Sequence, residues 1–130
     1  MDYKEIFAQS RSDIPKEGAF LAKYQNGNLE YFIDGKRSRN ELDGPAVICT
    51  NGIQIWMKDD MIHRLNGPAI TINNEVFIWY QRNKLHRTSG PAYVSENKVE
   101  YWINGEQVSE KKYDKYRQKY LNSEELIFMN

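Results

Sequence analysis

The 130-residue sequence has a single cysteine, no excess charge of either sign and no long apolar run. Cys49 has no partner for a disulfide within the chain, which favours a reducing compartment over secretion. Eighteen basic residues balance eighteen acidic ones, which argues against broad electrostatic binding to nucleic acid or to a membrane. No apolar stretch approaches the roughly 18 residues of a membrane span, and the first residues lack the pattern of a signal peptide. We expect a cytoplasmic protein of one domain.

Residues that carry catalysis or bind metals are also sparse. The chain has two histidines, His63 and His86. If successive copies of the motif described below stack, these rings lie roughly 10 Å apart, whereas a shared zinc ion needs both nitrogens within about 2.1 Å. Cys49 lies in a predicted strand, where an inert buried thiol is the usual state, and no glycine-rich phosphate loop is present. We therefore expect no enzymatic activity, no metal and no cofactor.

The chain does contain a motif that recurs at a fixed spacing. Each copy opens on Gly-Pro-Ala, at 44–46, 67–69 and 90–92, and a tryptophan follows twelve residues after each glycine, at Trp56, Trp79 and Trp102. A degenerate earlier copy begins near Gly18, and we assign its tryptophan position to Phe32. A constant period of roughly 23 residues is typical of repeat proteins, in which each small unit stacks on its neighbours.

Each copy predicts two short antiparallel strands. The first strands cover 46–50, 69–72 and 92–95, and the second strands cover 53–58, 75–81 and 98–104. Turn residues such as Asn51-Gly52 separate the two strands. A second turn, such as Asp59-Asp60, ends the copy, and the Gly-Pro step then interrupts the strand ladder because proline has no N–H to donate.

The two ends of the chain differ from the repeats. Residues 2–9 predict a short helical turn. From Ser109, a candidate N-cap, the sequence predicts a helix with a stripe of tyrosines at Tyr113, Tyr116 and Tyr120. We expect one mainly β domain over 1–130: an N-terminal segment (1–17), an antiparallel β-repeat meander or solenoid of about 3.5 units (18–108) and a C-terminal helical cap (109–128). A single-layer sheet and a closed solenoid are both compatible with the pattern.

Side-chain alternation along the second strands predicts two different faces. The predicted core face is apolar; its members are Leu29, Tyr31, Ile33, Ile53, Ile55, Met57, Val76, Ile78, Tyr80, Val99, Tyr101 and Ile103. The opposite face carries large aromatics beside polar residues, and we predict that a partner binds there; the candidates are Phe32, Gln54, Trp56, Phe77, Trp79 and Trp102. Successive tryptophans about 9–10 Å apart suit a protein anchor or stacked sugars. The alternative is that these aromatics are buried as a second core.

Basic residues form secondary candidates. The pairs His63-Arg64 and His86-Arg87 close two copies, and we expect them to hold turn carbonyls, with contact to an anion or a partner as the alternative. The loop that carries Lys36, Arg37 and Arg39 is a small basic patch. It is the best candidate for nucleic-acid contact, although the charge balance of the chain makes nucleic acid an improbable partner.

The stretch from Trp79 to Ala92 resembles a repeat of large tailed phages and giant viruses, Trp-Tyr-x-x-Gly-Lys-x-His-Arg-x-x-Gly-Pro-Ala. That repeat is similar to MORN repeats, which have the same period. The resemblance covers about residues 29–105, departs from the pattern at Gln81-Arg82-Asn83, and ends where Val108-Ser109 replaces His-Arg. It implies an elongated, curved antiparallel sheet that serves as a binding scaffold.

We therefore expect a non-enzymatic protein-binding module, a phage-encoded accessory protein of the host cytoplasm that binds or inhibits a host protein, such as a defence protein. Two alternatives stay open. One is a glycan- or cell-wall-binding repeat protein, which would use the same aromatics as sugar platforms. The other is a structural virion or assembly component, which would self-associate through its edge strands.

Overall fold

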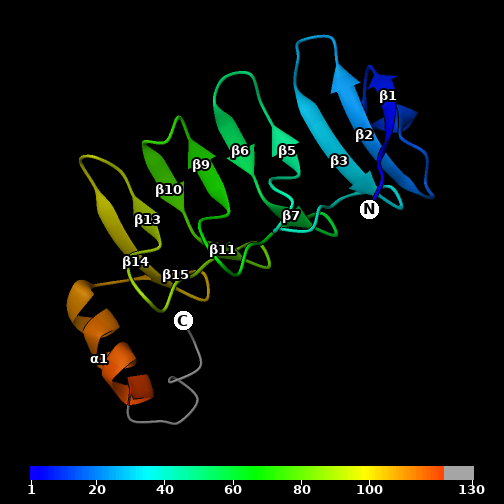
Figure 1. The fold of residues 1–130 in the computed structure, drawn as a ribbon. Coiled ribbons are helices and arrows are strands. Elements are labelled where there is room, and N and C mark those ends of the chain that lie inside the picture. Colours follow the sequence, from blue (N-terminus) through cyan, green and yellow to red (C-terminus); the bar gives the residue numbers. More distant parts are fainter. Residues whose placement is uncertain (122–130) are drawn as a thin grey trace.

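The computed structural model describes residues 1–121. They form a mainly β protein whose hairpins lie side by side in a row, with one helix at the C-terminal end (Figure 1). The main sheet is open, with the strand order β1-β2-β3-β5-β6-β9-β10-β13-β14-β15, and β4 pairs with β3 beside this path. Its strands are β1 (Lys4–Ala8), β2 (Ala19–Tyr24), β3 (Leu29–Ile33), β4 (Lys36–Arg37), β5 (Val47–Ile48), β6 (Ile53–Ile55), β9 (Ile70–Ile72), β10 (Val76–Ile78), β13 (Tyr93–Val94), β14 (Val99–Ile103) and β15 (Glu106–Val108).

Strand pairing is antiparallel throughout the described residues except between β1 and β2, which are parallel. The prediction of a mainly β, antiparallel sheet with a C-terminal helix is confirmed. The predicted helical turn over 2–9 is wrong, because Lys4–Ala8 instead pairs along its whole length with β2. A short 3-10 helix, η1 (Arg11–Asp13), follows β1.

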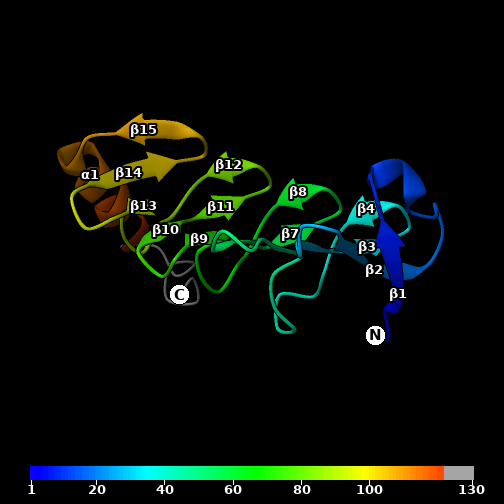
Figure 2. The same cartoon turned by 90° about the horizontal axis from the view of Figure 1, so that it is seen from above.

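The predicted second strands are broken at their tryptophans. Residues 53–58 divide into β6 and β7 (Met57–Lys58), and residues 75–81 divide into β10 and β11 (Tyr80–Gln81). Strand β7 pairs with β8 (Met61–Ile62), and β11 pairs with β12 (Lys84–Leu85). These short hairpins, together with β3–β4 and β14–β15, form a second row that turns away from the main row (Figure 2).

Two-residue turns close these short hairpins. Both residues of each turn have positive φ, as at Asp59 (49°) and Asp60 (65°), or at Asn104 (49°) and Gly105 (84°). Type I′ turns need this conformation at both central positions, and Asp, Asn and Gly adopt it most readily. The segments that the sequence indicated only as turns are therefore complete hairpins with arms of two or three residues.

Backbone hydrogen bonds identify the equivalent residues of successive hairpins. The N–H of Trp56 donates to Ala69 O and that of Trp79 to Ala92 O, each at 2.7 Å, and Tyr31 N–H donates to Ala46 O at 2.8 Å. In the last hairpin the equivalent residue is Tyr101, which pairs with Val108, seven residues later. Trp79 is related in the same way to His86, whose N–H donates to the Trp79 carbonyl. The step from Tyr31 to Trp56 is thus two residues longer than the step from Trp56 to Trp79, and the step from Trp79 to Tyr101 is one residue shorter.

This register corrects two predictions. Phe32 and Trp102 do not align with Trp56 and Trp79, because Tyr31 and Tyr101 hold those positions. The predicted core face is not one face either: Leu29 pairs with Ile48 and Ile48 with Gln54, so Leu29 lies on the side of Gln54 and not on the side of Ile53. A step of unequal length moves every following side chain to another register position, and a shift by one residue reverses the faces.

The helix α1 (Glu110–Leu121) caps the last hairpin. The predicted N-cap is confirmed, since Lys112 N–H donates to Ser109 Oγ at 3.1 Å. Tyr113 is buried and its ring lies 4.5 Å from that of Tyr101, while Tyr120 lies outside the residues whose side chains are described. No helix within residues 1–121 is both long and apolar enough to cross a membrane.

Candidate functional site

The outer side of the bend carries a series of stacked arginines. The guanidinium of Arg64 lies 4.0 Å from the centre of the Trp56 ring, and that of Arg87 lies 3.8 Å from the centre of the Trp79 ring. Arg39 lies in the same way over Tyr31, at 3.9 Å. In each of these three pairs the arginine follows its aromatic by eight residues. The rings of Tyr31, Trp56 and Trp79 are therefore covered by cations.

Each stacked arginine also holds the Gly-Pro-Ala segment. The Nη1 atoms of Arg39, Arg64 and Arg87 donate to the carbonyls of Pro45, Pro68 and Pro91, each at 3.1 Å. The glycine allows this close approach: a Cβ at Gly67 would lie 2.8 Å from Arg64 Cζ, and one at Gly90 would lie 2.9 Å from Arg87 Nη1. The three alanines are fully buried. The most regular motif of the sequence is thus accounted for by packing.

The histidines hold the turn of the next hairpin. His63 Nδ1 accepts the N–H of Arg82 at 3.1 Å, and His86 Nδ1 accepts the N–H of Asn104 at 3.0 Å. Burial lowers the pKa of both histidines, and the neutral ring is the form that accepts. The arginines bind carbonyls, as predicted for these pairs, whereas the histidines accept turn N–H groups instead.

The predicted contact residues are distributed over both sides of the sheet. Phe32 is fully buried, and Trp56 is 9% exposed. Trp79 and Trp102 are half-buried, but Trp102 lies on the side opposite to Trp79, and its Nε1 donates to Glu100 Oε1 at 3.1 Å. Gln54 and Phe77 both lie opposite Thr71, on the outer side. The structure therefore does not bring the six residues together into one surface.

A different surface emerges on the side toward which the short hairpins turn. Pairing of β5, β6, β9, β10 and β13 aligns apolar side chains on this side, and we call them the inner face: Val47, Cys49, Ile53, Ile55, Ile70, Ile72, Val76, Ile78 and Tyr93. Val47 is buried and the others are half-buried. Ile62 of β8 packs against the cluster of Val47 and Met57, so the short hairpins form one wall of this surface.

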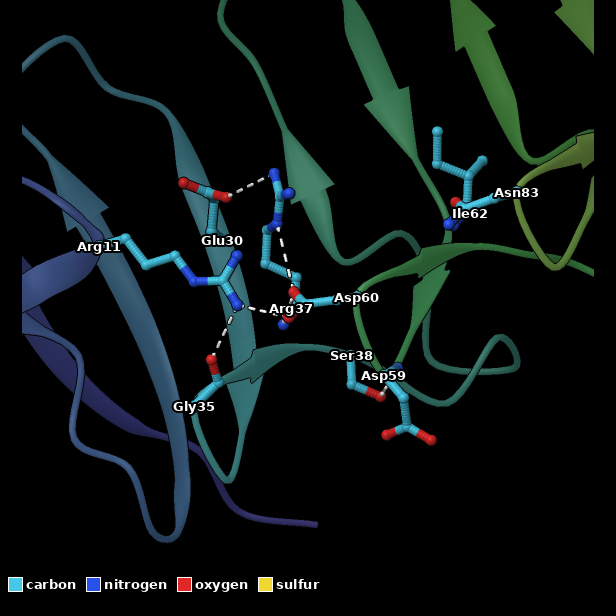
Figure 3. A network of polar contacts seen from close by, with 9 residues as sticks. All are labelled: Arg11, Glu30, Gly35, Arg37, Ser38, Asp59, Asp60, Ile62 and Asn83. Carbon is cyan, nitrogen blue, oxygen red and sulfur yellow. Dashed lines mark hydrogen bonds and ion pairs between the residues drawn. The ribbon is translucent and has the colours of Figure 1, made fainter.

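The N-terminal end of the inner face is polar (Figure 3). Arg37 on β4 reaches across the angle to Glu30 on β3, with Nη1 and Oε2 3.6 Å apart, and its Nε lies 3.7 Å from Asp60 Oδ1. Arg11 of η1 bridges the carbonyl of Gly35 and the carboxylate of Asp60. Burial acts to raise the pKa of Asp60, but the hydrogen bonds from Arg11 and from the Arg37 backbone outweigh it and hold that pKa below its usual value.

Other polar side chains line a groove of about 800 Å³ at this end; its lining comprises Ala8, Gln9, Tyr24, Gln25, Asn26, Asn28, Glu30, Arg37, Val47 and Cys49. Burial and a hydrogen bond with Glu30 raise the pKa of Tyr24. Burial raises the pKa of the Cys49 thiol, which suits the inert thiol predicted. Within residues 1–121, no cluster of three or more His, Cys, Asp or Glu side chains could hold a metal ion.

The C-terminal end of the inner face is polar as well. Lys98 Nζ lies 3.1 Å from Glu100 Oε2, and Gln107 Nε2 donates to the same oxygen at 3.4 Å. Burial acts to raise the pKa of Glu100, but its partners Lys98 and Trp102 lower it overall. The pair Glu100–Gln107 holds the register position of Glu30–Arg37 at the other end. In the two middle hairpins this position carries Ile55–Ile62 and Ile78–Leu85, so the surface is apolar at its centre and polar at its ends.

Sequence reasoning did not identify the inner face as a surface, because it assigned Ile53, Ile55, Val76 and Ile78 to a core and aligned the first and last copies one residue out of register. One signal was present in the sequence. Apolar residues alternate with exposed or aromatic ones in the two middle copies, where the structural step equals the period of the motif. The four apolar residues do lie on one side, as predicted: Ile53, Ile55, Val76 and Ile78.

Comparison with known proteins finds no family model, no curated protein and no solved structure that matches the chain. The resemblance to MORN-like viral repeats therefore stays a prediction from the sequence.

Proposed function

We propose that the chain is a non-enzymatic protein-binding module built from β-repeats, and that its partner lies along the inner face. The observation that carries this proposal is the alignment of eight half-buried apolar side chains on adjacent strands, beside the buried Val47. Contiguous, partly exposed apolar surface bordered by polar residues is typical of protein-interaction sites. The motif residues, by contrast, are occupied with packing and with turn contacts.

The shape of the inner face favours an amphipathic helix as the bound element. Strands β5 to β13 are separated by four spacings of about 4.8 Å, so the apolar region is about 19 Å long, the length of roughly 13 helical residues. The backbone N–H and C=O groups of these strands are hydrogen-bonded within the sheet, so its face has none left to pair with an added strand. A helix satisfies its own backbone and needs only an apolar stripe. Polar residues at both of its ends would meet Glu30–Arg37 and Lys98–Glu100.

The covered aromatics favour a protein ligand over the glycan alternative. Sugar platforms require an open aromatic face, whereas Trp56 is 9% exposed and both Trp56 and Trp79 carry a stacked arginine. The resemblance of residues 29–105 to viral repeats supports a virus-encoded accessory protein, and the bound protein on this proposal is a host protein, with a defence protein as one candidate.

Two lysine substitutions test the proposal. Val76 is half-buried on the inner face, and Val99 is 57% exposed on the outer side. The last hairpin already carries a lysine, Lys98, at the position equivalent to Val76, so we expect Val76→Lys to fold. Tagged wild type, Val76→Lys and Val99→Lys are each used to capture proteins from bacterial lysate, with mass spectrometry as the readout and circular dichroism as the folding control.

We expect one protein to be captured by the wild type and by Val99→Lys in equal amounts and to be lost with Val76→Lys. Capture that survives Val76→Lys but fails with Val99→Lys would place the contact on the outer side. A wild type that captures nothing would contradict the protein-binding proposal itself.

A further inference from the structure

The two ends of the main sheet are protected to different extents. At the C-terminal end, helix α1 packs on β14: Tyr113 stacks on Tyr101, and the Tyr113 hydroxyl donates to Thr88 O at 2.7 Å. The terminal strand there, β15, pairs with β14 over only three residues. At the N-terminal end the last strand is β1, which pairs with β2 and with no other strand of the described residues. Its second edge therefore presents backbone N–H and C=O groups that no strand within residues 1–121 satisfies, which is the usual template for strand addition.

The side chains of β1 differ between its two faces. Ile6 and Ala8 pack inward against the cluster of Ala22 and Phe32. Phe7 points to the outer side, beside Lys23, and is 91% exposed, the highest exposure among the large hydrophobic side chains of the described residues. An almost fully exposed phenylalanine on an unpaired edge strand is costly for a protein that functions as a monomer.

The C-terminal helix does not cover this edge. Helix α1 packs on β14, and seven other strands of the main sheet lie between β14 and β1. Since no strand within residues 1–121 pairs with the outer edge of β1, we consider an element of another molecule as its cover.

We infer that two copies of the chain pair through β1, antiparallel about a two-fold axis at Ile6. This arrangement pairs all five residues of the strand and is self-complementary, as a closed dimer requires. It sets Ile6 opposite Ile6 of the second copy, on the same side of the sheet as Ala22, and Lys4 opposite Ala8. Phe7 lies opposite Glu5 and diagonally across from the second Phe7, within reach of an aromatic contact.

The dimer joins the two main sheets into one. Ala8 and Gln9 line the polar groove beside β1, so the grooves of the two copies become neighbours across the axis. The module then presents two inner faces, one from each copy, at a fixed separation. A bivalent partner gains affinity from such an arrangement without any new contact.

The test is the mass in solution, measured by light scattering during gel filtration over a series of concentrations. We expect the wild type to approach twice the 15.4 kDa of one chain as concentration rises. Phe7→Glu places a carboxylate opposite Glu5 and removes the exposed ring, and we expect it to weaken the dimer by at least about tenfold. Phe7 lies opposite Lys23 within one chain, and Lys23 already pairs with Glu5 at 3.0 Å. The new carboxylate would share this cation on an exposed side of the strand, so we expect the monomer to keep its fold.

Leu42→Glu is the matched control, because Leu42 is 85% exposed but lies between β4 and β5, outside the strand that pairs in the dimer. It should leave the dimer unchanged. The double variant Glu5→Lys, Phe7→Glu tests the register, since it sets the introduced lysine of one copy opposite the introduced glutamate of the other and should restore much of the dimer. A wild type that stays monomeric at the highest concentration, or a dimer that Phe7→Glu leaves intact, would overturn the inference.

Discussion

The glycine of each Gly-Pro-Ala segment can be tested directly, because we attribute the need for glycine to the space that an arginine side chain occupies. We predict that Gly90→Ala destabilises the protein through Arg87 alone. An alanine Cβ at this position would lie 2.9 Å from Arg87 Nη1 and 3.0 Å from Arg87 Cζ, so the guanidinium must move. Gly90 is preferable to Gly44 for this test, because Gly44 has φ of 129° and an alanine there is strained by its backbone as well.

The magnitude follows from the contacts that Arg87 would lose. Its stacking on Trp79, at 3.8 Å, is worth about 1–2 kcal/mol for a half-buried pair. Its hydrogen bond to Pro91 O, at 3.1 Å, is worth about 1.5–3 kcal/mol because the donor is charged. Alanine lowers the conformational entropy of the unfolded chain, which stabilises the folded state by about 0.4–1 kcal/mol. Complete displacement of the guanidinium would therefore lower the free energy of unfolding by about 2–4 kcal/mol, and this is the largest effect that we expect.

A double-mutant cycle separates this cause from others. Urea unfolding of Gly90→Ala, Arg87→Ala and the double variant is followed by far-UV circular dichroism, because the fluorescence of Trp79 would respond to the stack itself. In the Arg87→Ala background, Gly90→Ala should cost nothing or should stabilise slightly. If Gly90→Ala is equally destabilising without the arginine, the glycine is required by the backbone and our explanation of the motif is refuted.

Three further predictions concern single contacts. His63 and His86 have lowered pKa values in the folded state, so below about pH 6.5 the unfolded chain binds more protons than the folded chain. Their contribution to the free energy of unfolding should be complete above that pH and should decrease as the pH falls. Replacing both histidines by serine should remove most of this pH dependence, as measured by urea titrations. Tyr113→Phe removes the hydrogen bond to Thr88 O and should lower that free energy by about 1 kcal/mol in thermal melts, while a loss within error would show that the hydroxyl is dispensable. Cys49 should react with a disulfide reagent at pH 8 more slowly in the folded protein than in urea, because burial raises its pKa and the thiolate is the reactive form; equal rates would contradict this.

The features that the sequence predicted correctly are those determined by neighbouring residues. The first hairpin strands, the turn at Asn51-Gly52 and the N-cap at Ser109 depend on contacts a few residues apart, and all of them are present. The short hairpins were missed because arms of two residues, such as Met57–Lys58, are too short to show alternation. The break before them results from the turn of the chain at Trp56, which depends on a hydrogen bond to Ala69 in the next copy.

The aromatic residues that were predicted to share one face are divided between two sides for a different reason. The period counted from the three tryptophans is constant, yet the structural step into the last hairpin is one residue shorter. Its strands are joined by a turn of two residues, between Ser95 and Lys98, whereas three residues lie between Ile72 and Val76. Trp102 is thereby moved to the position of Tyr80, on the inner side. The spacing of identical residues and the spacing of equivalent positions are different quantities, and only the pairing register gives the second one.

This difference also indicates where function can lie in such a chain. Residues that recur along the chain, such as Arg64, Gly67 and Ala69, have structural roles that are the same in each of these copies: they cover a ring, bind a carbonyl and bury a methyl group. A bound partner, by contrast, contacts each copy with a different part of its own surface and therefore requires different residues from one copy to the next. The position that carries Glu30, then Ile55 and Ile78, and finally Glu100 meets no common structural need, and its polar-apolar-polar order would suit a ligand with a matching order. The irregular positions of the inner face, rather than the recurring motif, are therefore the residues to vary in a search for the partner.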